Sequence, residues 1–569
     1  METENYYQVI FNTSGTSSAV LTNNDNIEKV YIEERLTNQY GDNIPMMALQ
    51  TIADGKKVSH LGLTSYEDNP GSWSALTKFF SVFSGTSNGE DGQVLTHREV
   101  HYLNALASIL HSGFEEAHVF CFTPPTPKSE YGKSHESIII INPKRACCNI
   151  SFRQMLGPNV PVKKHENWPD SHYNRKTYSV YEAFRCIKEH TECSTFKEMY
   201  AVSQLGHPDK LIPNILSKYG GQTSQFKLEG GKQIFNTYEY VNFAVMTKDL
   251  LNYNEEKNNH RKKEVYLNLL YRLQKDYEEY LINSVDEYFS SLTRDVASTS
   301  KNIVLTGHLT DNVRANYLLL KSLKEGHSLY VDPLCNEVAS SMGFAYELIG
   351  SSEIIPKAVK NFYLGQELNL EDYSLNDYED EKSVTPKEVA NLLADGNIIA
   401  IAQGRAEITD HSLGNRSILG DPRTRESKHT LSRSKYQPEH LPVIASTLEE
   451  SAKEWFDMDR LENSPEAMYA VDALDNTKEK AEGAVFADGS TRVQTVNSEQ
   501  NEHFYNLIKE FGDLTGVPML LNTSLNIHTY PIADTMFGIM EFMRCSGVNY
   551  IYLPETGKLL FVPATSTES

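Results

Sequence analysis

An acidic segment in the second half of the chain predicts two parts with separate cores. Residues 366–384, QELNLEDYSLNDYEDEKSV, are poor in aliphatic side chains, a composition typical of a linker or an exposed loop. Thr385 and Pro386 then form a good helix start, because a capping hydroxyl precedes proline at the first helical position. The 569 residues also exceed one ordinary core, and the length alone suggests about three or four domain-sized units. We therefore expect domains over residues 1–365 and 385–569, joined by an acidic linker.

The composition and the charge exclude several classes of protein. A formal net charge of −23 argues against a protein that holds nucleic acid over a broad electrostatic footprint, although a local basic groove stays open. Seven cysteines without CxxC spacing predict reduced thiols rather than a disulfide framework or a structural zinc. The first residues, METENYYQVIFN, lack a basic region followed by an apolar core, and the apolar runs are far shorter than the roughly 20 residues of a membrane-spanning helix. We expect a cytoplasmic protein with no membrane role.

Strand and helix signals alternate along most of the chain, which predicts an α/β fold. Residues 7–23, YQVIFNTSGTSSAVLTN, predict two strands joined by a turn. Apolar residues at helical spacing predict a long helix over residues 264–293. In the second part, residues 387–404, KEVANLLADGNIIAIAQG, predict a helix, an Asp-Gly turn, a buried strand and a loop.

A loop with the side chains of an anion site follows that last strand. Residues 401–423, IAQGRAEITDHSLGNRSILGDPR, begin at the strand end, a favoured place for ligands in α/β folds. The arginines can fork onto phosphate or carboxylate oxygens, the glutamate can accept from a substrate amide or help to hold Mg²⁺, and the asparagine can both donate and accept. These side chains are Arg405, Glu407, Asn415, Arg416 and Arg423. The turn dipeptides Gly-Asn and Asp-Pro support a purely structural loop equally well.

Two further segments carry polar side chains suited to the same chemistry. Residues 486–496, FADGSTRVQTV, predict a turn between strands, and residues 515–532, TGVPMLLNTSLNIHTYPI, predict a buried strand that ends in an Asn-Thr-Ser run. A run of donors at the carboxyl end of a strand suits phosphate or ribose binding. The polar residues of the two segments are Asp488, Arg492, Asn522, Thr523 and Ser524.

In order and spacing, the three segments resemble the carbamoyltransferases of the nodulation-protein NodU, cephalosporin carbamoyltransferase and nebramycin synthase type. The hallmarks of that family are similar to GRxExGPRALGNRSILxDPR, DGTARxQTV and TGxPxLLNTSFNxxxEPI, which match residues 404–423, 488–496 and 515–532. The resemblance implies a C-terminal α/β domain similar to threonylcarbamoyl-adenylate synthases, which makes carbamoyl-adenylate from carbamoyl phosphate and ATP with Mg²⁺. It also implies an N-terminal domain of the actin/sugar-kinase-like (ASKHA) fold, which passes the carbamoyl group to an acceptor hydroxyl. The residues implied to bind ATP and carbamoyl phosphate are Arg405, Glu407, Asn415, Arg416, Ser417, Arg423, Arg492, Asn522, Thr523 and Ser524.

The resemblance further implies an N-terminal site for iron or zinc. In THREVHYLNALASIL, His97 and His101 stand four residues apart, a spacing that lets two imidazoles on one helical face share a metal. Thr96 and Glu99 match a capping box, which would place His97 in the first turn of that helix. Glu337 stands in the place of a family aspartate as a further ligand. Without the resemblance, histidines at this spacing are more often surface or helix-capping residues.

Several positions of the family pattern are changed in this chain. The segment GHLTDNVRAN resembles GGxxLNxxxN and keeps Gly307 and Asn312, which are implied to bind carbamoyl-adenylate, but it loses one glycine. A glutamine at an arginine position removes a bidentate charged contact, and each such hydrogen bond is worth roughly 1.5–3 kcal/mol. The departures are Gly15 and Thr16 for a His-Asp pair, Thr123 for an Asp-Gly turn, His411 and Gln437 for arginines, Phe486 for a histidine and Tyr530 for a glutamate.

These observations leave three functions open, and none of them identifies a catalytic residue. The intact C-terminal motifs favour an ATP-dependent O-carbamoyltransferase, whose acceptor hydroxyl belongs to a small molecule, a sugar or a hydroxymethylated base. The joint N-terminal losses favour a catalytically degenerate subunit of a heteromeric carbamoyltransferase, with a regulatory, acceptor-binding or adenylate-forming role only. A generic sugar-kinase-like phosphotransferase explains the N-terminal fold but not the C-terminal motifs. We expect a homo- or hetero-oligomer, with a complete paralogue as one candidate partner and nucleic acid as a partner only in the role of acceptor.

Overall fold

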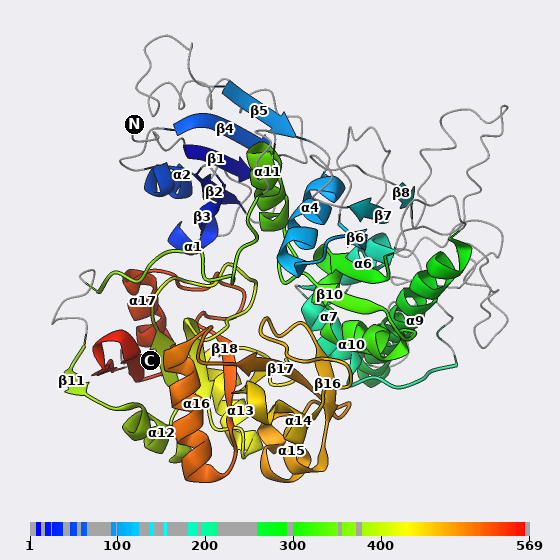
Figure 1. The fold of residues 1–569 in the computed structure, drawn as a ribbon. Helices are drawn as coiled ribbons and strands as arrows, with labels where there is room; N and C mark the ends of the chain where they lie inside the picture. Colours follow the sequence, from blue (N-terminus) through cyan, green and yellow to red (C-terminus); the bar gives the residue numbers. More distant parts are fainter. Residues whose placement is uncertain are drawn as a thin grey trace, which may run out of the picture.

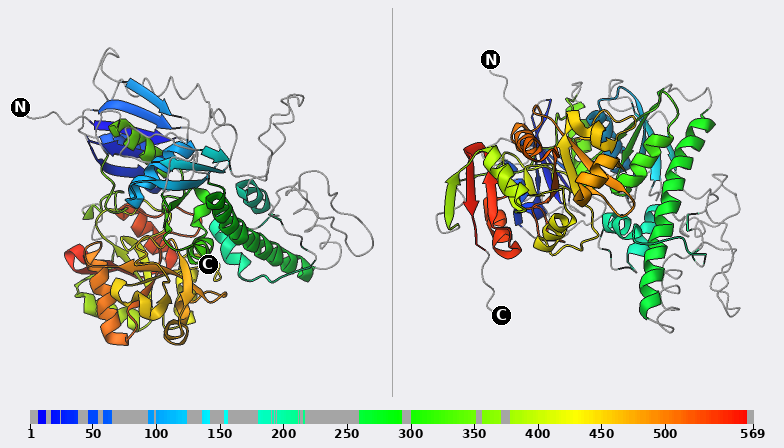
Figure 2. Two further views of the ribbon diagram at one scale, coloured as in Figure 1. Left: turned by 45° about the vertical axis from the view of Figure 1, so that its right-hand side comes forward. Right: turned by 90° about the horizontal axis from the view of Figure 1, so that it is seen from below.

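The computed structural model contains two small β-sheets and one large β-sheet, with helices packed on each (Figure 1). The left view of Figure 2 shows the small sheets on one side of the molecule and the large sheet on the other. The residues described are 7–12, 17–23, 25–37, 46–53, 58–64, 93–97, 100–123, 136–141, 153–155, 180–189, 191, 193, 195–210, 212, 215–216, 259–292, 300–350, 356–370 and 378–563.

The first sheet is built from the first hundred residues. Its strands are β1 (Tyr7–Asn12), β2 (Ser18–Thr22), β3 (Ile27–Ile32), β4 (Val58–Thr64) and β5 (Gln93–His97), and the helices between β3 and β4 are α1 (Glu33–Thr37) and α2 (Met46–Ala53). The strands β3, β2 and β1 form an antiparallel meander, and β4 and β5 then run parallel to β1 in the order β3-β2-β1-β4-β5. The two strands predicted over residues 7–23 are therefore confirmed as β1 and β2.

The second sheet repeats the first in strand order and direction. Its strands are β6 (Ala117–Phe122), β7 (Glu136–Ile141), β8 (Arg153–Met155), β9 (Asn302–Thr306) and β10 (Ser328–Val331). A meander of β8, β7 and β6 is again extended by two parallel strands, in the order β8-β7-β6-β9-β10. The helical elements along this part are α6 (Val180–Lys188), α7 (Phe196–Ser203), α9 (Asn259–Ser291), η1 (His308–Asp311) and α10 (Val313–Ser322). The predicted long helix is confirmed as α9.

Two helices are exchanged between the small sheets. Helix α4 (Val100–Ser112) follows the first sheet in the chain but packs on β6, β7 and β9 of the second, whereas α11 (Val338–Gly350) follows the second sheet and packs on β1, β2 and β4 of the first. The two helices lie side by side between the sheets (Figure 1). A Cβ on Gly343 of α11 would lie 2.5 Å from the carbonyl carbon of Leu103 on α4, so only glycine permits this approach. Two copies of one five-stranded unit with exchanged helices are the arrangement expected of an ASKHA domain, and this prediction is confirmed.

The large sheet has ten strands and forms the core of the C-terminal part. Its strands, in spatial order, are β11 (Asp380–Ser383), β20 (Lys558–Phe561), β19 (Tyr550–Leu553), β12 (Ile399–Ala402), β13 (Arg416–Gly420), β18 (Met519–Ser524), β14 (Ile444–Leu448), β17 (Ser490–Val496), β16 (Ala470–Ala473) and β15 (Phe456–Asp457). The helices packed around it include α12 (Pro386–Ala394), α13 (Arg425–Ser434), α16 (Glu502–Thr515) and α17 (Met536–Ser546). Thr385 caps α12 and Pro386 lies in its first turn, as the sequence predicts, and Glu388 completes a capping box with Thr385. The α/β class is confirmed for both parts.

The expected acidic linker is partly ordered into these cores. Residues 380–383 form β11, an exposed edge strand that pairs antiparallel with β20. Just before it, residues 362–368 are hydrogen-bonded to residues 404–408: Gly365 N donates to Ala406 O (2.9 Å) and Ile408 N donates to Phe362 O (2.9 Å). Leu364 O also accepts from Val30 N of β3 (3.0 Å). We call residues 362–368 the strap, because its backbone bonds join the first sheet to the C-terminal part.

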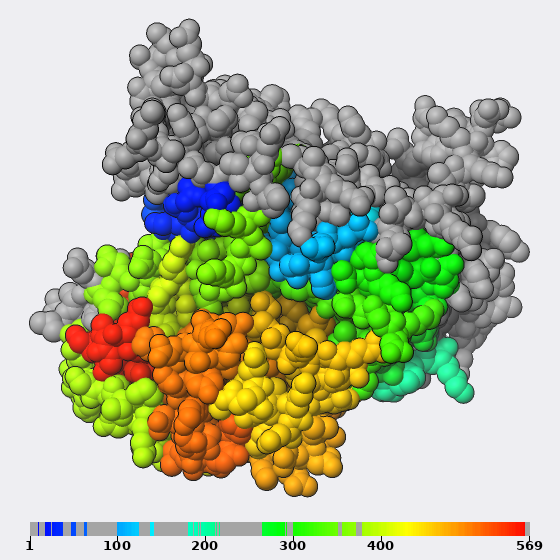
Figure 3. Space-filling view, viewed as in Figure 1, coloured from blue at the N-terminus to red at the C-terminus, as the bar shows by residue number. Residues whose placement is uncertain are grey.

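The N-terminal and C-terminal parts also meet beside α10. Asn316 of α10 donates to Met468 O (3.0 Å), and Tyr317 donates to Asp457 O (2.7 Å). In the space-filling view, residues 300–350 in green adjoin the yellow and orange surface of the C-terminal part (Figure 3). Within the described ranges, no helix combines the length and the apolar character that crossing a membrane requires.

Candidate functional site

The three motif segments converge at one side of the large sheet. Gln494 of β17 donates to Leu413 O of the loop that follows β12 (2.9 Å). Asn522 of β18 donates to the side-chain oxygen of Gln494 (3.2 Å), to Ser446 Oγ (3.0 Å) and to Ser412 O (3.4 Å). Segments far apart in the sequence are therefore joined by one buried network of hydrogen bonds. The side-chain amide oxygen of Asn522, Oδ1, is buried and has no hydrogen bond to any described residue.

Arg416, one of the predicted phosphate contacts, is fully buried and fully bonded. A guanidinium has five N–H donors, and those of Arg416 reach five backbone carbonyls at 2.6–3.1 Å. The acceptors belong to Gln366, Gln403, Gly404, Asn415 and Asp534. No donor of Arg416 is left for a ligand in this state, so its contribution is to fix the loop that follows β12. Phosphate contact by Arg416 stays a prediction that requires one of these bonds to exchange.

Arg405 and Arg423 are also engaged by the protein. Arg405 donates to the carbonyls of Gly365 (3.1 Å), Leu364 and Glu28 (2.9 Å), and so holds the strap to the first sheet. Arg423 pairs with Asp421 across 2.6 Å and donates to Ala394 O (2.7 Å) at the end of α12.

The other predicted residues of this loop orient its backbone. Glu407 is fully buried, and its Oε1 accepts from the N–H groups of Leu413 and Asn415 (3.3 Å for Asn415), while its Oε2 has no hydrogen bond within the described ranges. Asn415 donates to Arg405 O (2.7 Å), and Ser417 Oγ accepts from Gly414 N (3.1 Å). Glu407 Oε2 is therefore the loop atom best placed to receive a donor or a cation.

Arg492 and His411 form the centre of the junction between the two parts. Arg492 of β17 is buried, donates to Ala467 O (2.7 Å) and pairs with Asp311 of η1 (3.2 Å). His411 Nε2 lies 2.6 Å from Glu466 O; because a carbonyl only accepts, Nε2 carries the proton, and Nδ1 is the acceptor for Arg492 (3.2 Å). Burial lowers the pKa of His411 well below its usual value, and the charge of Arg492 lowers it further. The residue at an expected arginine position thus supplies a neutral acceptor.

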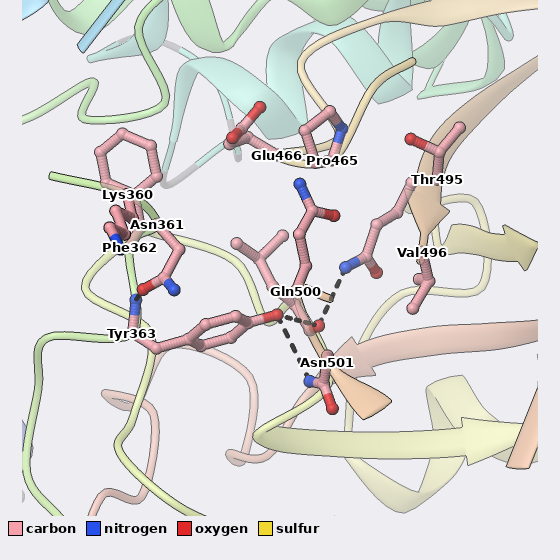
Figure 4. Close-up of a pocket in the computed structure, with 12 residues that line it drawn as sticks. Lys360, Asn361, Phe362, Tyr363, Pro465, Glu466, Thr495, Val496, Gln500 and Asn501 are labelled. Carbon is pink, nitrogen blue, oxygen red and sulfur yellow. Dashed lines mark hydrogen bonds between the residues drawn. The ribbon is translucent and has the colours of Figure 1, made fainter. Parts of the chain in front are cut away.

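A small pocket lies beside Leu413 of the loop that follows β12. Gln494, Tyr363 and Asn501 line it, with Glu466 across the pocket from Asn501 (Figure 4). Tyr363 donates to Leu413 O (3.0 Å) and accepts from Asn501 (3.4 Å). Burial raises the pKa of the Glu466 carboxyl from 4.5 to about 7, and the charge of Asp332 adds to the shift.

Two lysines at the junction were not predicted as site residues. Lys435, at the end of α13, is 2% exposed and donates to Thr523 Oγ1 (3.0 Å), Ser524 O (2.7 Å) and Ser524 Oγ (2.9 Å). Lys197 of α7 is partly buried and is electrostatically coupled to Arg492 and to Lys435. Sequence reasoning gives no signal for either residue, because lysines are almost never fully buried and no pattern separates these two from surface lysines.

Gly307 and Asn312 have clear local roles in the N-terminal part. Gly307 has a φ of 100°, and a Cβ there would lie 2.6 Å from the carbonyl carbon of Phe122. Asn312 caps α10 by accepting from Ala315 N (3.2 Å). Binding of carbamoyl-adenylate by this pair stays a prediction.

The expected metal site is not found within the described ranges. Thr96 and His97 lie in β5, paired with Leu63 and Thr64 of β4, and α4 begins only at Val100, so the predicted capping box and shared helical face are wrong. The partners of the other two expected ligands are hydroxyl and imidazole groups of the protein: His101 Nδ1 lies 2.7 Å from Ser137 Oγ, and Glu337 lies 3.1 Å from His308. No group of three His, Cys, Asp or Glu residues that could hold a metal occurs in the part of the chain that is described, in which the His97 side chain is not included.

The positions that depart from the family pattern occupy different environments in the structure. Thr123, in the register of the expected Asp-Gly turn, lies 3.1 Å from His308 Nδ1, and His308 itself stands where one glycine is lost. Phe486 packs with Tyr200 of α7, Val313 and Ala470 in a cluster between the two parts. Tyr530 is exposed, and Gly15 and Thr16 lie outside the described residues.

Comparisons with known proteins agree with the motif segments. Residues 390–557 match the family described as Carbamoyltransferase C-terminus. The chain is 30% identical to the nodulation protein NolNO of Sinorhizobium fredii over 250 residues (42% of this chain, 36% of the relative) and 30% identical to NolO of Bradyrhizobium diazoefficiens over 254 residues (42% and 46%). It is 27% identical to the nodulation protein U of Sinorhizobium fredii over 274 residues (47% and 48%). The chain spans about half the length of the curated relatives it matches. Among solved structures, HypF of T. kodakarensis aligns with a TM-score of 0.32 at 10% identity, over 61% of this chain and 48% of that one.

Proposed function

This chain belongs to the carbamoyltransferase family that includes the nodulation proteins NodU and NolO, and on that premise we propose that it is an ATP-dependent O-carbamoyltransferase. In the proposed reaction, carbamoyl phosphate, ATP and one water give carbamoyl-adenylate, phosphate and pyrophosphate. An acceptor hydroxyl then attacks the carbamoyl carbon, AMP leaves, and the hydroxyl proton passes to a base. The acceptor is a sugar, another small molecule or a hydroxymethylated base.

One observation carries the proposal: the three motif segments meet at the junction of the two parts. Arg492 from β17, the loop after β12 and the end of β18 surround one buried region, which the N-terminal part closes through Asp311. Carbamoyl-adenylate is a mixed anhydride that water destroys, so an enclosed junction is a suitable place to make it and pass it on. Cationic side chains there would stabilise the charge that develops as phosphates are exchanged.

The residues fit Mg²⁺ at the C-terminal site better than a metal at the N-terminal one. Mg²⁺ is commonly held by one or two carboxylates together with substrate phosphates, and the buried Glu407 Oε2 offers one such oxygen. The ion would neutralise phosphate charge there. The N-terminal residues expected to hold iron or zinc do not fit, because His97 ends a strand and Glu337 is bonded to His308.

The purified chain, given ATP, Mg²⁺ and carbamoyl phosphate, should release pyrophosphate, and omission of any one of the three should stop the release. Arg492→Met should lower the rate by about tenfold or more, because it removes a charged donor from the junction. The exposed Arg425, which pairs with Glu482 on the surface, gives the matched control, and Arg425→Met should be as active as the unmodified chain. No pyrophosphate release would eliminate adenylate formation by the isolated chain.

A second candidate function is a subunit that makes the adenylate but needs a partner to transfer it. The observation in its favour is His308, which replaces a glycine of the family pattern. Its ring contacts both Thr123 and Glu337, the two positions where carboxylate ligands are expected. Pyrophosphate release without carbamoylation of any acceptor, followed by transfer once a complete paralogue is added, would favour this role. Carbamoylation by the isolated chain would exclude it.

A further inference from the structure

Helix α7 carries a lysine from the N-terminal part to the C-terminal motifs. The helix is fixed at the junction because Glu198 pairs with His528 in the loop after β18 (2.8 Å), and Tyr200 packs against Phe486 and Ala470. Thr195 and Glu198 form a capping box that sets the first turn. Lys197 lies in that first turn, so its position is defined by both parts of the chain.

The ammonium group of Lys197 has no partner within the described ranges. No hydrogen bond or ion pair of Lys197 occurs there, although the residue is partly buried. The two acidic groups coupled to it are engaged elsewhere: Asp311 pairs with Arg492 (3.2 Å), and Asp410 accepts from Asn336 (2.6 Å). Lys197 is therefore a partly buried ammonium group that no carboxylate of the described residues contacts directly, although the charges of Asp311 and Asp410 favour its protonated form.

Lys435 lies close to α7 in the C-terminal part: His528, the partner of Glu198, donates its backbone N–H to Lys435 O (2.8 Å). Among the described residues, no carboxylate pairs with the Lys435 ammonium group. Its three acceptors are two hydroxyls and one carbonyl, all neutral, although the side chain is almost fully buried. Burial lowers the pKa of Lys435 well below its usual value, and the charge of Lys197 is the second cause. The pKa of Lys197 is also lowered: burial is the largest cause, and the charge of Arg492 is the second. Buried cations are stable only when they are paired, and the two nearby carboxylates, Asp311 and Asp410, are outnumbered by the three cationic side chains. The remaining positive charge favours the binding of an anion.

We propose that Lys197 and Lys435 together bind one phosphoryl group of a substrate, with Lys197 reaching into the C-terminal site from the N-terminal part. A dianionic phosphoryl group matches two ammonium groups, and the hydroxyls of Thr523 and Ser524 are close enough to Lys435 to add donors. The identity of the substrate rests on the proposed function: the phosphoryl group is that of carbamoyl phosphate or of ATP. The pairing of the lysines with a phosphoryl anion does not depend on turnover. Each part of the chain thus supplies a contact that the other lacks.

The test is phosphate binding by the full chain and its Lys197→Met variant, measured by calorimetry with inorganic phosphate as the probe. Loss of a charged hydrogen bond should weaken phosphate binding by about tenfold or more. Without phosphate, Lys197→Met should unfold at the same temperature as the unmodified chain or at a higher one, because it removes a repulsive charge and breaks no hydrogen bond. Lys509, an exposed lysine of α16 paired with Asp513, gives the control with the same change of charge, and Lys509→Met should bind phosphate normally.

Two further arms identify the source of the phosphoryl group. Carbamoyl phosphate alone and ATP alone are each tested for protection of Lys197 against an amine-acylating reagent, with the modified residues located by mass spectrometry. Protection by carbamoyl phosphate assigns the site to that substrate, and protection by ATP assigns it to the nucleotide. Protection in a chain that releases no pyrophosphate would support the anion site and count against the proposed function. An active chain in which Lys197→Met binds phosphate as tightly as the unmodified protein would overturn the site alone, as would failure of both carbamoyl phosphate and ATP to protect Lys197.

Discussion

The partly buried carboxyl of Glu466 should make the protein less stable as the pH rises. Burial raises the pKa of this group from 4.5 to about 7, so the folded chain holds a proton on Glu466 that the unfolded chain has already released. Folding is therefore favoured below about pH 4.5, and the advantage is lost as the pH rises towards about 7. Above that pH Glu466 is charged in both the folded and the unfolded chain, so its effect on the free energy of unfolding no longer changes with pH.

The difference between 4.5 and about 7 corresponds to at most about 3 kcal/mol of unfolding free energy. Glu466→Gln keeps the shape of the side chain and cannot ionise. The variant should match the unmodified chain near pH 4.5 and exceed it by up to about 3 kcal/mol at pH 8. Its backbone carbonyl, the partner of His411, is unchanged by the substitution.

Urea unfolding of the two proteins between pH 4.5 and pH 8 measures this difference, provided that the slope m is shared. Other buried acids, such as Glu34, also have a raised pKa, so the result is the difference between the variant and the unmodified chain at each pH. Glu462→Gln, at an exposed position four residues away, is the control and should follow the unmodified chain. Parallel curves for Glu466→Gln and the unmodified chain across the whole range would refute the reasoning.

Two further substitutions test the packing of the helices and the state of His411. Gly343→Ala should lower the unfolding free energy by about 3 kcal/mol in urea, because the new Cβ would meet the rigid backbone of Leu103, whereas Gly538→Ala in α17 meets only ordinary contacts from 3.4 Å and should change it by less than about 1 kcal/mol. Equal effects of the two would contradict the close approach of α4 and α11. His411→Arg should cost about 3 kcal/mol in thermal unfolding, because it buries a second guanidinium beside Arg492, while His411→Gln can still donate to Glu466 O and accept from Arg492 and should stay within about 1 kcal/mol. A stable His411→Arg would show that the junction accommodates the arginine that the family pattern has there.

Elements with strong local signals are predicted correctly from the sequence. The cap, the proline and the glycine turn of helix α12 all lie in neighbouring residues, and the apolar residues of α9 recur at helical spacing from Val265 to Phe289. The strand β18 follows from a continuous apolar run before its polar end. Each of these patterns depends on residues close in the chain, which is why no tertiary information is needed.

The errors occur where contacts with residues distant in the sequence determine the secondary structure or the bonding of a side chain. Thr96 and Glu99 match a capping box, but Thr96 and His97 pair with β4 and therefore lie in a strand. A pattern of neighbouring residues cannot predict that pairing. The acidic residues of β11 look like a linker because an exposed edge strand tolerates charge. The motif arginines are recognisable by type, yet their bonding to carbonyls from several segments appears only once the chain is folded. For the same reason, Lys197 and Lys435 become a pair only when both parts are in place.

The exchange of α4 and α11 sets an order in which the N-terminal part can fold. Every strand of the first sheet has been synthesised once residue 97 is made, but the helix that covers β1, β2 and β4 is completed only at residue 350. During synthesis, at roughly 5–20 residues per second, the apolar face of the first sheet must therefore wait for more than ten seconds without its cover. The second sheet has no such delay, because α4 is made before any of its strands. Folding on the ribosome should start from the second sheet, with the first completed last, and a chain interrupted between the two helices would expose an unprotected sheet face.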